Sequence, residues 1–146
     1  MQIRQMKEED RQSVIEMMRV FYASDAVSTN GSLEIFTADF DACISPSPYL
    51  SGYVFDCDGE IVGYAMTAHS FSTEFGKPCL WIEDLYIKEK YRHIGIGGAF
   101  FEFIESRHTD SALRLEVEPE NENALRLYKK RGFTFLNYGE MIKNER

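Results

Sequence analysis

A cluster of glycines follows an arginine at the point where an apolar, strand-like run gives way to a helical pattern. The arginine is Arg92, and the glycines are Gly95, Gly97 and Gly98. Apolar residues then recur at the spacing of one helix face, at Ile96, Ala99, Phe100, Phe103 and Ile104. The first amides of such a helix have no partner within it and lie at the positive end of its dipole. The turn therefore predicts a site for a phosphate or pyrophosphate group, with Arg92 adding charge.

The spacing of these glycines excludes two common phosphate loops. A Walker loop needs a Gly-Lys-Ser/Thr ending, and a Rossmann fingerprint needs G-x-G-x-x-G near the chain start with an acidic residue about 20 residues later. Neither pattern is present. A nucleotide-like cofactor is one interpretation of the turn. Taken alone, the glycines are equally compatible with a tightly packed turn that binds nothing.

A second motif favours the cofactor. Asn121, Ala124 and Tyr128 share one face of an expected helix, which Asn121 can cap and Gly132 can end. Together, Arg92-x-x-Gly95-x-Gly97 and the later Asn-x-x-Ala-x-x-Leu-Tyr-x-x-x-Gly-Phe resemble the Gcn5-related N-acetyltransferase (GNAT) superfamily. Members of that superfamily bind acetyl-coenzyme A and acetylate amines. The resemblance covers roughly residues 1 to 143.

The resemblance implies an α/β fold with a mixed, mostly antiparallel central sheet and helices on both faces. It also implies a central strand that is bulged and splayed from its neighbour, so that the pantetheine arm of acetyl-coenzyme A pairs with its backbone. No metal is expected. The residues implied to contact the cofactor are Leu85, Tyr86, Ile87, Arg92, His93, Ile94, Gly95, Ile96, Gly97, Gly98, Asn121, Ala124 and Tyr128.

Two residues of the turn depart from the superfamily pattern. His93 stands where a glycine or another small residue is common, and Ile94 replaces a frequent Lys or Arg. The loss of one phosphate contact predicts weaker coenzyme A affinity, although the backbone amides do most of the binding.

A narrower resemblance lies just upstream. Residues 72–98 place a Ser-Thr turn before a strand that carries Glu83-Asp84-Leu85. This segment resembles the acetyltransferases of diamines, polyamines such as spermidine and spermine, and thialysine. It implies that the acceptor is a small cationic amine.

Amine acetylation assigns roles to three of these residues. A protonated amine must lose a proton before it attacks, and the departing thiolate needs a donor. Glu83 is the candidate base, directly or through a water, and Asp84 the candidate partner of the substrate ammonium. The resemblance places Tyr128 beside the coenzyme A sulfur as the proton donor. The alternatives are a solubilising carboxylate pair and a core tyrosine.

Adjacent carboxylates on an unbroken strand point to opposite faces. For both to serve one site, the strand needs a distortion, and a bulge within residues 83–86 would re-aim one side chain. We expect the acceptor to be lined by residues 22–36 and 69–76, with Tyr22, Phe36 and Phe75 as aromatic contacts. His69 is a further candidate for this cleft. Cys79 is a weak candidate nucleophile because no His or Asp pattern activates it.

Composition favours one intracellular domain spanning residues 1–146. The chain is 44% hydrophobic and 14% aromatic, and its net charge of −8 argues against nucleic acid as a partner. Three cysteines without C-x-x-C spacing indicate a reducing compartment. No apolar run approaches a length of about 18 residues, which a helix needs to span a bilayer. The start lacks the apolar region of a signal peptide. We expect a cytoplasmic location, no membrane partner and a small-molecule substrate, and a homodimer stays open.

Periodicity predicts alternating strands and helices. Asp58-Gly59 is a strong hairpin signal, and the apolar spacing of 8–22 is helical. The expected strands are 2–6, 50–57, 60–71, 80–87, 112–117, 133–136 and 140–143. The expected helices are 8–22, 32–44, 96–107 and one that begins at Asn121.

The leading hypothesis for function is N-acetyl transfer to a small amine in a ternary complex. The alternatives are acetylation of a peptide N-terminus or lysine, and a non-catalytic acetyl-coenzyme A sensor.

Overall fold

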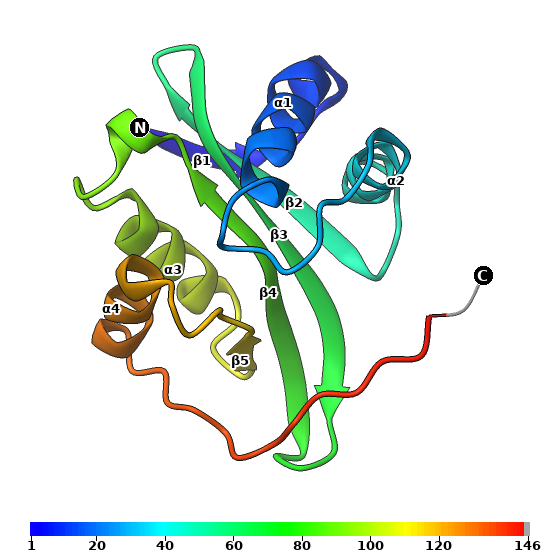
Figure 1. Ribbon diagram of the computed structural model, residues 1–146, viewed down its shortest axis with the longest axis vertical. Helices are drawn as coiled ribbons and strands as arrows, with labels where there is room; N and C mark the ends of the chain where they lie inside the picture. Colours follow the sequence, from blue (N-terminus) through cyan, green and yellow to red (C-terminus); the bar gives the residue numbers. More distant parts are fainter. Residues whose placement is uncertain (145–146) are drawn as a thin grey trace.

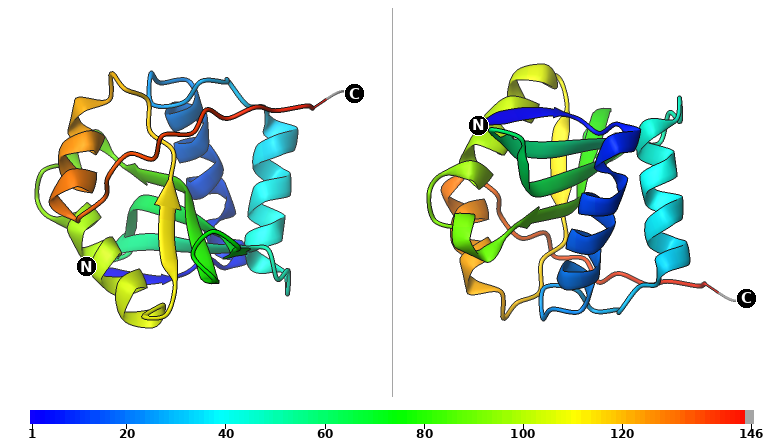
Figure 2. Two further views of the ribbon diagram at one scale, coloured as in Figure 1. Left: turned by 90° about the horizontal axis from the view of Figure 1, so that it is seen from below. Right: turned by 90° about the horizontal axis from the view of Figure 1, so that it is seen from above.

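The structure, a computed structural model, describes residues 1–144 and contains a central sheet with helices on both faces (Figures 1 and 2). Five strands follow one another across the sheet in chain order. They are β1 (Gln2–Gln5), β2 (Leu50–Cys57), β3 (Glu60–Ser72), β4 (Lys77–Ile87) and β5 (Ala112–Leu115). Neighbouring strands are antiparallel except β4 and β5, which are parallel. This confirms the expected mixed, mostly antiparallel sheet.

Two helices cover each face. Helices α1 (Arg11–Tyr22) and α2 (Leu33–Ile44) lie on one side, and α3 (Ile96–Arg107) and α4 (Glu122–Lys130) on the other (Figure 2). Short 3-10 turns, Glu8–Asp10 and Glu89–Tyr91, precede α1 and α3. Within residues 1–144, none of these helices is long and apolar enough to cross a membrane.

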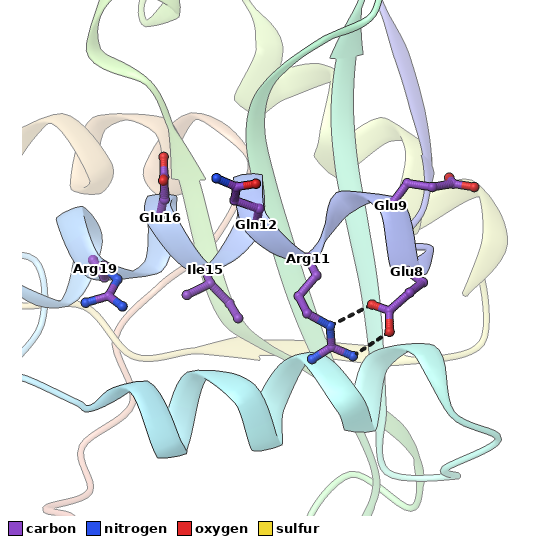
Figure 3. A pocket seen from close by; sticks show the side chains of 7 residues that line it. All are labelled: Glu8, Glu9, Arg11, Gln12, Ile15, Glu16 and Arg19. Carbon is purple, nitrogen blue, oxygen red and sulfur yellow. Dashed lines mark hydrogen bonds and ion pairs between the residues drawn. The ribbon is translucent and has the colours of Figure 1, made fainter.

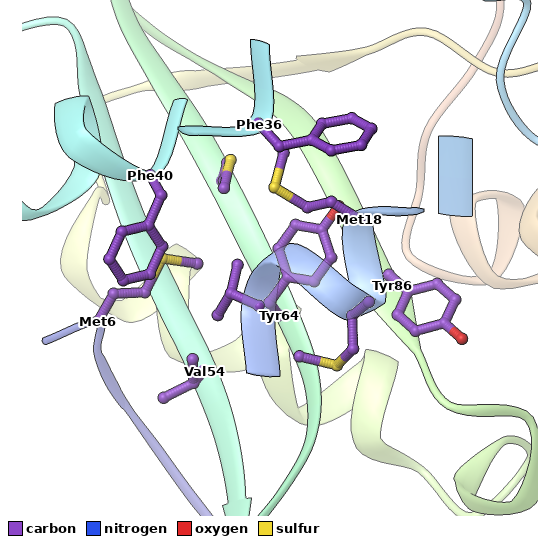
Figure 4. Packing of buried hydrophobic residues seen from close by; sticks show 10 residues of the cluster. Met6, Met18, Phe36, Phe40, Val54, Tyr64 and Tyr86 are labelled. Carbon is purple, nitrogen blue, oxygen red and sulfur yellow. The ribbon is translucent and has the colours of Figure 1, made fainter. Parts of the chain in front are cut away.

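The first face is packed with sulfur-containing and aromatic side chains (Figure 4). The apolar spacing of α1 turns Val14, Met17 and Met18 inward, as predicted. Helix α2 begins at Ser32, whose side chain accepts a hydrogen bond of 3.2 Å from the amide of Ile35. The inward side chains of α1 and α2 share one buried cluster with side chains of β2, β3 and β4.

The second face is packed by α3 and α4. Phe100, Phe101 and Ile104 are fully buried against the sheet. A Cβ added at Gly97 would lie 2.8 Å from a Leu127 methyl group, so the two helices approach each other closely at this glycine. Close packing therefore accounts for one of the glycines in the turn.

β4 contains a bulge at Glu83. Across the pair with β3, Met66 faces Asp84 and Thr67 faces Ile82, which leaves Glu83 without a partner. This confirms the distortion predicted within residues 83–86. Before the bulge, Ile82 packs into the α3 side of the sheet; after it, Asp84 and Tyr86 lie on the α1 and α2 side. The extra residue has shifted the alternation of the strand by one.

The expected splay between β4 and β5 is also present. The two strands pair only from Cys79 to Ile82, opposite Ala112 to Leu115. From Glu83 to Ile87, no described strand pairs with β4 on that side. Apart from the Ile87 carbonyl, which accepts a hydrogen bond from Arg92, the backbone groups on this edge are therefore open to a ligand.

Two expectations about the end of the chain are wrong. The strand expected over 112–117 ends at Leu115, and residues 133–136 and 140–143 form no strand. Phe133 packs against Tyr128, and the hydroxyl of Tyr138 donates a hydrogen bond of 2.6 Å to Glu74 in the turn between β3 and β4. These contacts carry the segment past that turn instead of along the sheet edge (Figure 1).

Candidate functional site

Two tyrosine hydroxyls bind the carboxylate of Asp84. Tyr22, at the end of α1, donates to Oδ1 at 2.8 Å, and Tyr64, in β3, donates to Oδ2 at 2.7 Å. Asp84 is only 4% exposed. Burial raises the pKa of its carboxyl, and the hydrogen bonds from Tyr64 and Tyr22 partly offset this. Asp84 is thus a buried acid held in a fixed orientation.

Other carboxyls gather around Asp84. Half-buried Asp39 of α2 has its pKa raised to about 6 by burial and by the charges of Asp84 and Glu83. More than a third of Glu83 is exposed. Its pKa is nevertheless raised, first by partial removal from water and then by the charges of Asp84 and Glu140. The pKa of Glu116 is raised to about 7, first by a hydrogen bond with Glu140 and then by burial.

These residues form a cluster, here called the carboxyl cluster: Asp39, Glu83, Asp84, Glu116 and Glu140. Within residues 1–144 none of the five is in an ion pair. Their mutual repulsion shows in the raised pKa values and would be relieved by a bound cation. The same range contains no group of three or more His, Cys, Asp or Glu arranged to hold a metal ion.

The predicted acceptor residues are brought together only in part. The Tyr22 and Phe36 rings lie 5.3 Å apart beside Asp84, but Phe36 is buried in the core and not on a cleft wall. Phe75 is exposed in the turn between β3 and β4, roughly 20 Å along the strand from Asp84. Sequence reasoning grouped Phe75 with the others because it could not place the long hairpin.

His69 lies away from the carboxyl cluster. Its Nε2 is 2.8 Å from the hydroxyl of Ser51, and its ring is 6.0 Å from that of His108, the residue that caps the C-terminal end of α3. Burial and His108 lower its pKa. Cys79 is a buried free thiol. Neither residue therefore stands in a catalytic arrangement with Asp84.

The glycine turn has the geometry of an anion site. Gly95 caps α3 with a φ of 95°, and the amides from His93 to Gly98 have no backbone or side-chain acceptor among the described residues. A Cβ built at Gly95 or Gly98 would meet nothing within 4 Å, so the space beside them is open. Free amides facing open space at a helix start fit a pyrophosphate.

Arg92 and His93 flank this turn. The Arg92 Nε donates a hydrogen bond of 2.7 Å to the carbonyl of Ile87, and its guanidinium lies 5.6 Å from the centroid of the Tyr86 ring. These contacts hold its charge next to the turn. His93 adopts a φ of 64°, a left-handed conformation that suits glycine better. The backbone explains why a small residue is common at this position.

The Asn121 motif lies on α4 beside the turn. Asn121 caps the helix, and its side-chain oxygen accepts from the amide of Ala124 at 3.3 Å, as predicted. Tyr128 stands between the rings of Phe101 and Phe133, and burial raises its pKa to about 12. Its hydroxyl has no hydrogen-bond partner in residues 1–144 and is not fully buried. At neutral pH it is a protonated donor available to a ligand.

Among the hollows on the surface are two of unequal size. The larger, about 480 Å³, runs along the outer side of α1 and contains none of the candidate residues (Figure 3). The smaller, about 310 Å³, lies between the turn of β3 and β4 and the strand β5. Its lining consists of Ser70, Phe71, Ser72, Thr73, Glu74, Cys79, Trp81 and Arg114. Trp81 is two residues from Glu83, so this hollow adjoins the carboxyl cluster.

Tyr64, Asp39 and Glu116 were not foreseen. Tyr64 and Asp39 come from separate elements, and nothing in their local spacing distinguishes them from core or surface residues. Glu116 lies within the strand expected over 112–117, which was expected to splay from the strand that carries Glu83, and this position was the one usable signal.

Comparison with known proteins identifies relatives. The family model described as acetyltransferase (GNAT) family matches residues 14–133. A thialysine N-epsilon-acetyltransferase of Bos taurus is 36% identical over 55% of this chain and 48% of the relative, and an uncharacterised N-acetyltransferase of Lactobacillus delbrueckii is 34% identical over 56% and 50%. The chain thus spans about half the length of the curated relatives it matches.

Solved structures share the fold across the chain. A possible acetyltransferase from Clostridium difficile has a TM-score of 0.80 at 21% identity, covering 99% of this chain and 97% of the other. AAC(6')-Iy, solved in complex with the bisubstrate analogue CoA-S-monomethyl-acetylneamine, has a TM-score of 0.79 at 14% identity, covering 99% and 98%. At these identities the likeness concerns the fold alone.

Proposed function

The chain belongs to the acetyltransferase (GNAT) family, and we propose that it transfers an acetyl group from acetyl-coenzyme A to the primary amine of a small cation. The observation that carries this proposal is the carboxyl cluster beside the bulge of β4, which forms no ion pair within residues 1–144. The name of the bovine relative, a thialysine acetyltransferase, favours a lysine analogue among such amines. Diamines and polyamines are the other members of this class.

Acetyl-coenzyme A, when bound, supplies an activated acyl group. The free amides from His93 to Gly98 and the charge of Arg92 bind its pyrophosphate. The unpaired edge of β4 from Glu83 to Ile87 offers donors and acceptors to the amides of its pantetheine arm. Both features support a long ligand that runs from the start of α3 into the splay between β4 and β5.

Glu83 accepts the proton of the acceptor amine in this proposal. It is the exposed member of the pair, and its raised pKa lies nearer to neutral than that of an ordinary glutamate. Asp84 has a different role because both of its oxygens already accept hydrogen bonds from tyrosines. It supplies a fixed negative charge that attracts the ammonium form of the amine.

Tyr128 donates a proton to the departing sulfur. Its hydroxyl carries a proton over the whole neutral range and has no partner among the described residues that would compete for it. The rings of Phe101 and Phe133 fix its orientation. The same tyrosine is a core residue, so its two roles must be separated by experiment.

The first test is thiol release from acetyl-coenzyme A by the purified protein. The acceptors are diamines, polyamines, lysine analogues, amino acids and short peptides, with a reaction that lacks amine as the control. We expect release with small cationic amines and little with peptides. Release with peptides alone would replace the proposal by peptide acetylation. Tight binding of acetyl-coenzyme A without release from any amine would favour a sensing module.

We further propose a homodimer that acts in the cytoplasm. Cys43, Cys57 and Cys79 are free thiols, which suits a reducing compartment. The end of the described chain exposes several large apolar side chains, namely Phe135, Leu136, Tyr138, Met141 and Ile142. Light scattering across a concentration series tests the assembly, and a constant monomer mass would contradict it.

A further inference from the structure

A tryptophan of β4 and an arginine of β5 form a cross-strand pair at the edge of the carboxyl cluster. Trp81 and Arg114 face each other across the two strands, and the guanidinium carbon lies 4.7 Å from the centroid of the Trp81 ring. The residues on either side of each pack into the core under α3: Leu80, Ile82, Leu113 and Leu115. Because strand side chains alternate, Trp81 and Arg114 project from the opposite side of the sheet.

The next residues on that side are acidic. Glu83 follows Trp81 by two residues, and Glu116 follows Arg114 by two, which places each about 7 Å further along the sheet. Arg114 forms no ion pair and no hydrogen bond within residues 1–144. An unneutralised cation thus stands a short distance from a group of unneutralised carboxyls.

Arg114 lines the hollow of about 310 Å³. Glu74 lines it too, and its carboxylate accepts a hydrogen bond of 2.6 Å from Tyr138 but is not paired with Arg114. Hydroxyls complete the polar lining at Ser70, Ser72 and Thr73. One cation, one carboxylate and several hydroxyls in a small hollow suit a zwitterionic group.

We propose that this hollow binds the α-amino acid group of the acceptor, with Arg114 binding its carboxylate, while the distant side-chain amine lies at the carboxyl cluster. This inference rests on the proposed acetyl transfer and names its acceptor class as a diamino acid. An extended four-carbon side chain matches the separation of two strand residues between Arg114 and Glu116. A diamine or polyamine would instead place its second cation beside Arg114, which is unfavourable.

The test compares two acceptors that differ only in the carboxylate, lysine and cadaverine. We expect the wild-type protein to acetylate lysine with the higher kcat/KM. Arg114→Gln should lower kcat/KM for lysine about 10- to 100-fold, chiefly through KM, because a charged hydrogen bond is lost. It should raise kcat/KM for cadaverine, because the repulsion between Arg114 and the second ammonium is relieved. Arg114→Lys should retain part of the lysine activity.

Arg107→Gln is the matched control. Arg107 ends α3 and lies over the Phe103 ring, on the other face of the sheet, so the same loss of charge there should leave both acceptors unaffected. An unchanged thermal unfolding midpoint of Arg114→Gln shows that the fold is intact. Should it fall, Arg114→Lys carries the comparison.

Three results would overturn the inference. One is a wild-type preference for cadaverine, and another is an equal loss on lysine and cadaverine in Arg114→Gln. The third is thiol release with polyamines but none with lysine; in that case acetyl transfer to small amines still stands. Absence of release with every amine would instead refute the proposed function itself, and the acceptor class with it.

Discussion

The hydroxyl of Tyr64 donates a hydrogen bond of 2.7 Å to Oδ2 of Asp84, from the middle of the neighbouring strand. Tyr64 is fully buried, so this bond is shielded from water. The residue that the sequence marks as a substrate ligand is therefore also part of the core. The carboxylate of Asp84 therefore contributes both to the stability of the fold and to the proposed attraction of the substrate.

Tyr64→Phe should destabilise the fold. Removal of the hydroxyl leaves a buried carboxylate oxygen without its donor, at a cost of about 1–3 kcal/mol in the free energy of unfolding. Tyr22→Phe should cost less, because Tyr22 is only half-buried. Urea unfolding of both variants checks the ranking. Identical midpoints for Tyr64→Phe and the wild type would show that the bond contributes nothing.

Asp39→Asn should stabilise the protein at pH 7 but not at pH 4. The pKa of Asp39 is raised to about 6, so the folded state binds its proton more tightly than the unfolded state. That advantage is complete below the unfolded pKa and is lost as the pH rises through about 6. The substitution removes the ionised carboxyl and should gain about 1–2 kcal/mol at pH 7, given its partial exposure. Thermal unfolding at both pH values decides this; an equal gain at both would exclude titration of Asp39 as the cause.

Glu83→Gln should lower kcat/KM about 10²- to 10⁴-fold, the usual effect of a positioned base. A base acts only when ionised, and the pKa of Glu83 is raised, so the wild-type rate should fall with acid at a pH above that of an ordinary glutamate. The loss should be largest between this pKa and the pKa of the amine, where free amine is scarce. A pH–rate profile of both proteins measures it. Parallel profiles would leave Glu83 with a structural role.

Tyr128→Phe should lower kcat about ten- to a hundred-fold with little change in acetyl-coenzyme A affinity, because the proton donor is lost while the ring remains. The Phe101 and Phe133 contacts do not need the hydroxyl, so the fold should persist. Stopped assays with saturating amine, together with calorimetric titration of acetyl-coenzyme A, separate the two quantities. Unaltered kcat would remove Tyr128 from the chemistry.

Gly98→Ala and Gly97→Ala form a matched pair on one helix turn. A Cβ at Gly98 meets open space, whereas one at Gly97 lies 2.8 Å from Leu127. Gly98→Ala should therefore keep or raise stability by about 0.5–1 kcal/mol, since alanine favours a helix, yet weaken acetyl-coenzyme A binding. Gly97→Ala should lower stability. If Gly98→Ala binds acetyl-coenzyme A with wild-type affinity, the ligand does not lie against the glycine turn.

Local signals predicted much of the fold. Asp58-Gly59 forms the expected hairpin turn, with φ values of 52° and 90°, and the Asn121 cap and the glycine turn lie where the motifs put them. Each of these features depends on residues close together in the chain. The interactions that determine each of them involve only a few neighbouring residues, so the sequence alone is enough to predict them.

Convergence from distant elements was harder to foresee. Tyr64 and Asp39 reach Asp84 from β3 and α2, and no periodicity encodes that meeting. The strands expected over 133–136 and 140–143 failed for a related reason. Alternating apolar residues favour an extended chain, but a strand also requires a partner edge, and Tyr138 is instead tied to Glu74.

The bulge at Glu83 has a consequence for how this sequence can change over evolution. One unpaired residue exchanges the two faces of everything that follows it in β4. Deletion of that position would turn Asp84 and Tyr86 towards α3 and bring Leu85 and Ile87 to the substrate side. A substitution at Glu83 would change the functional group at the site. A change in length there would instead exchange which side chains of the following strand residues face α3 and which face the substrate. The number of residues in β4 should therefore be under stronger selection than the identity of the residue at its bulge.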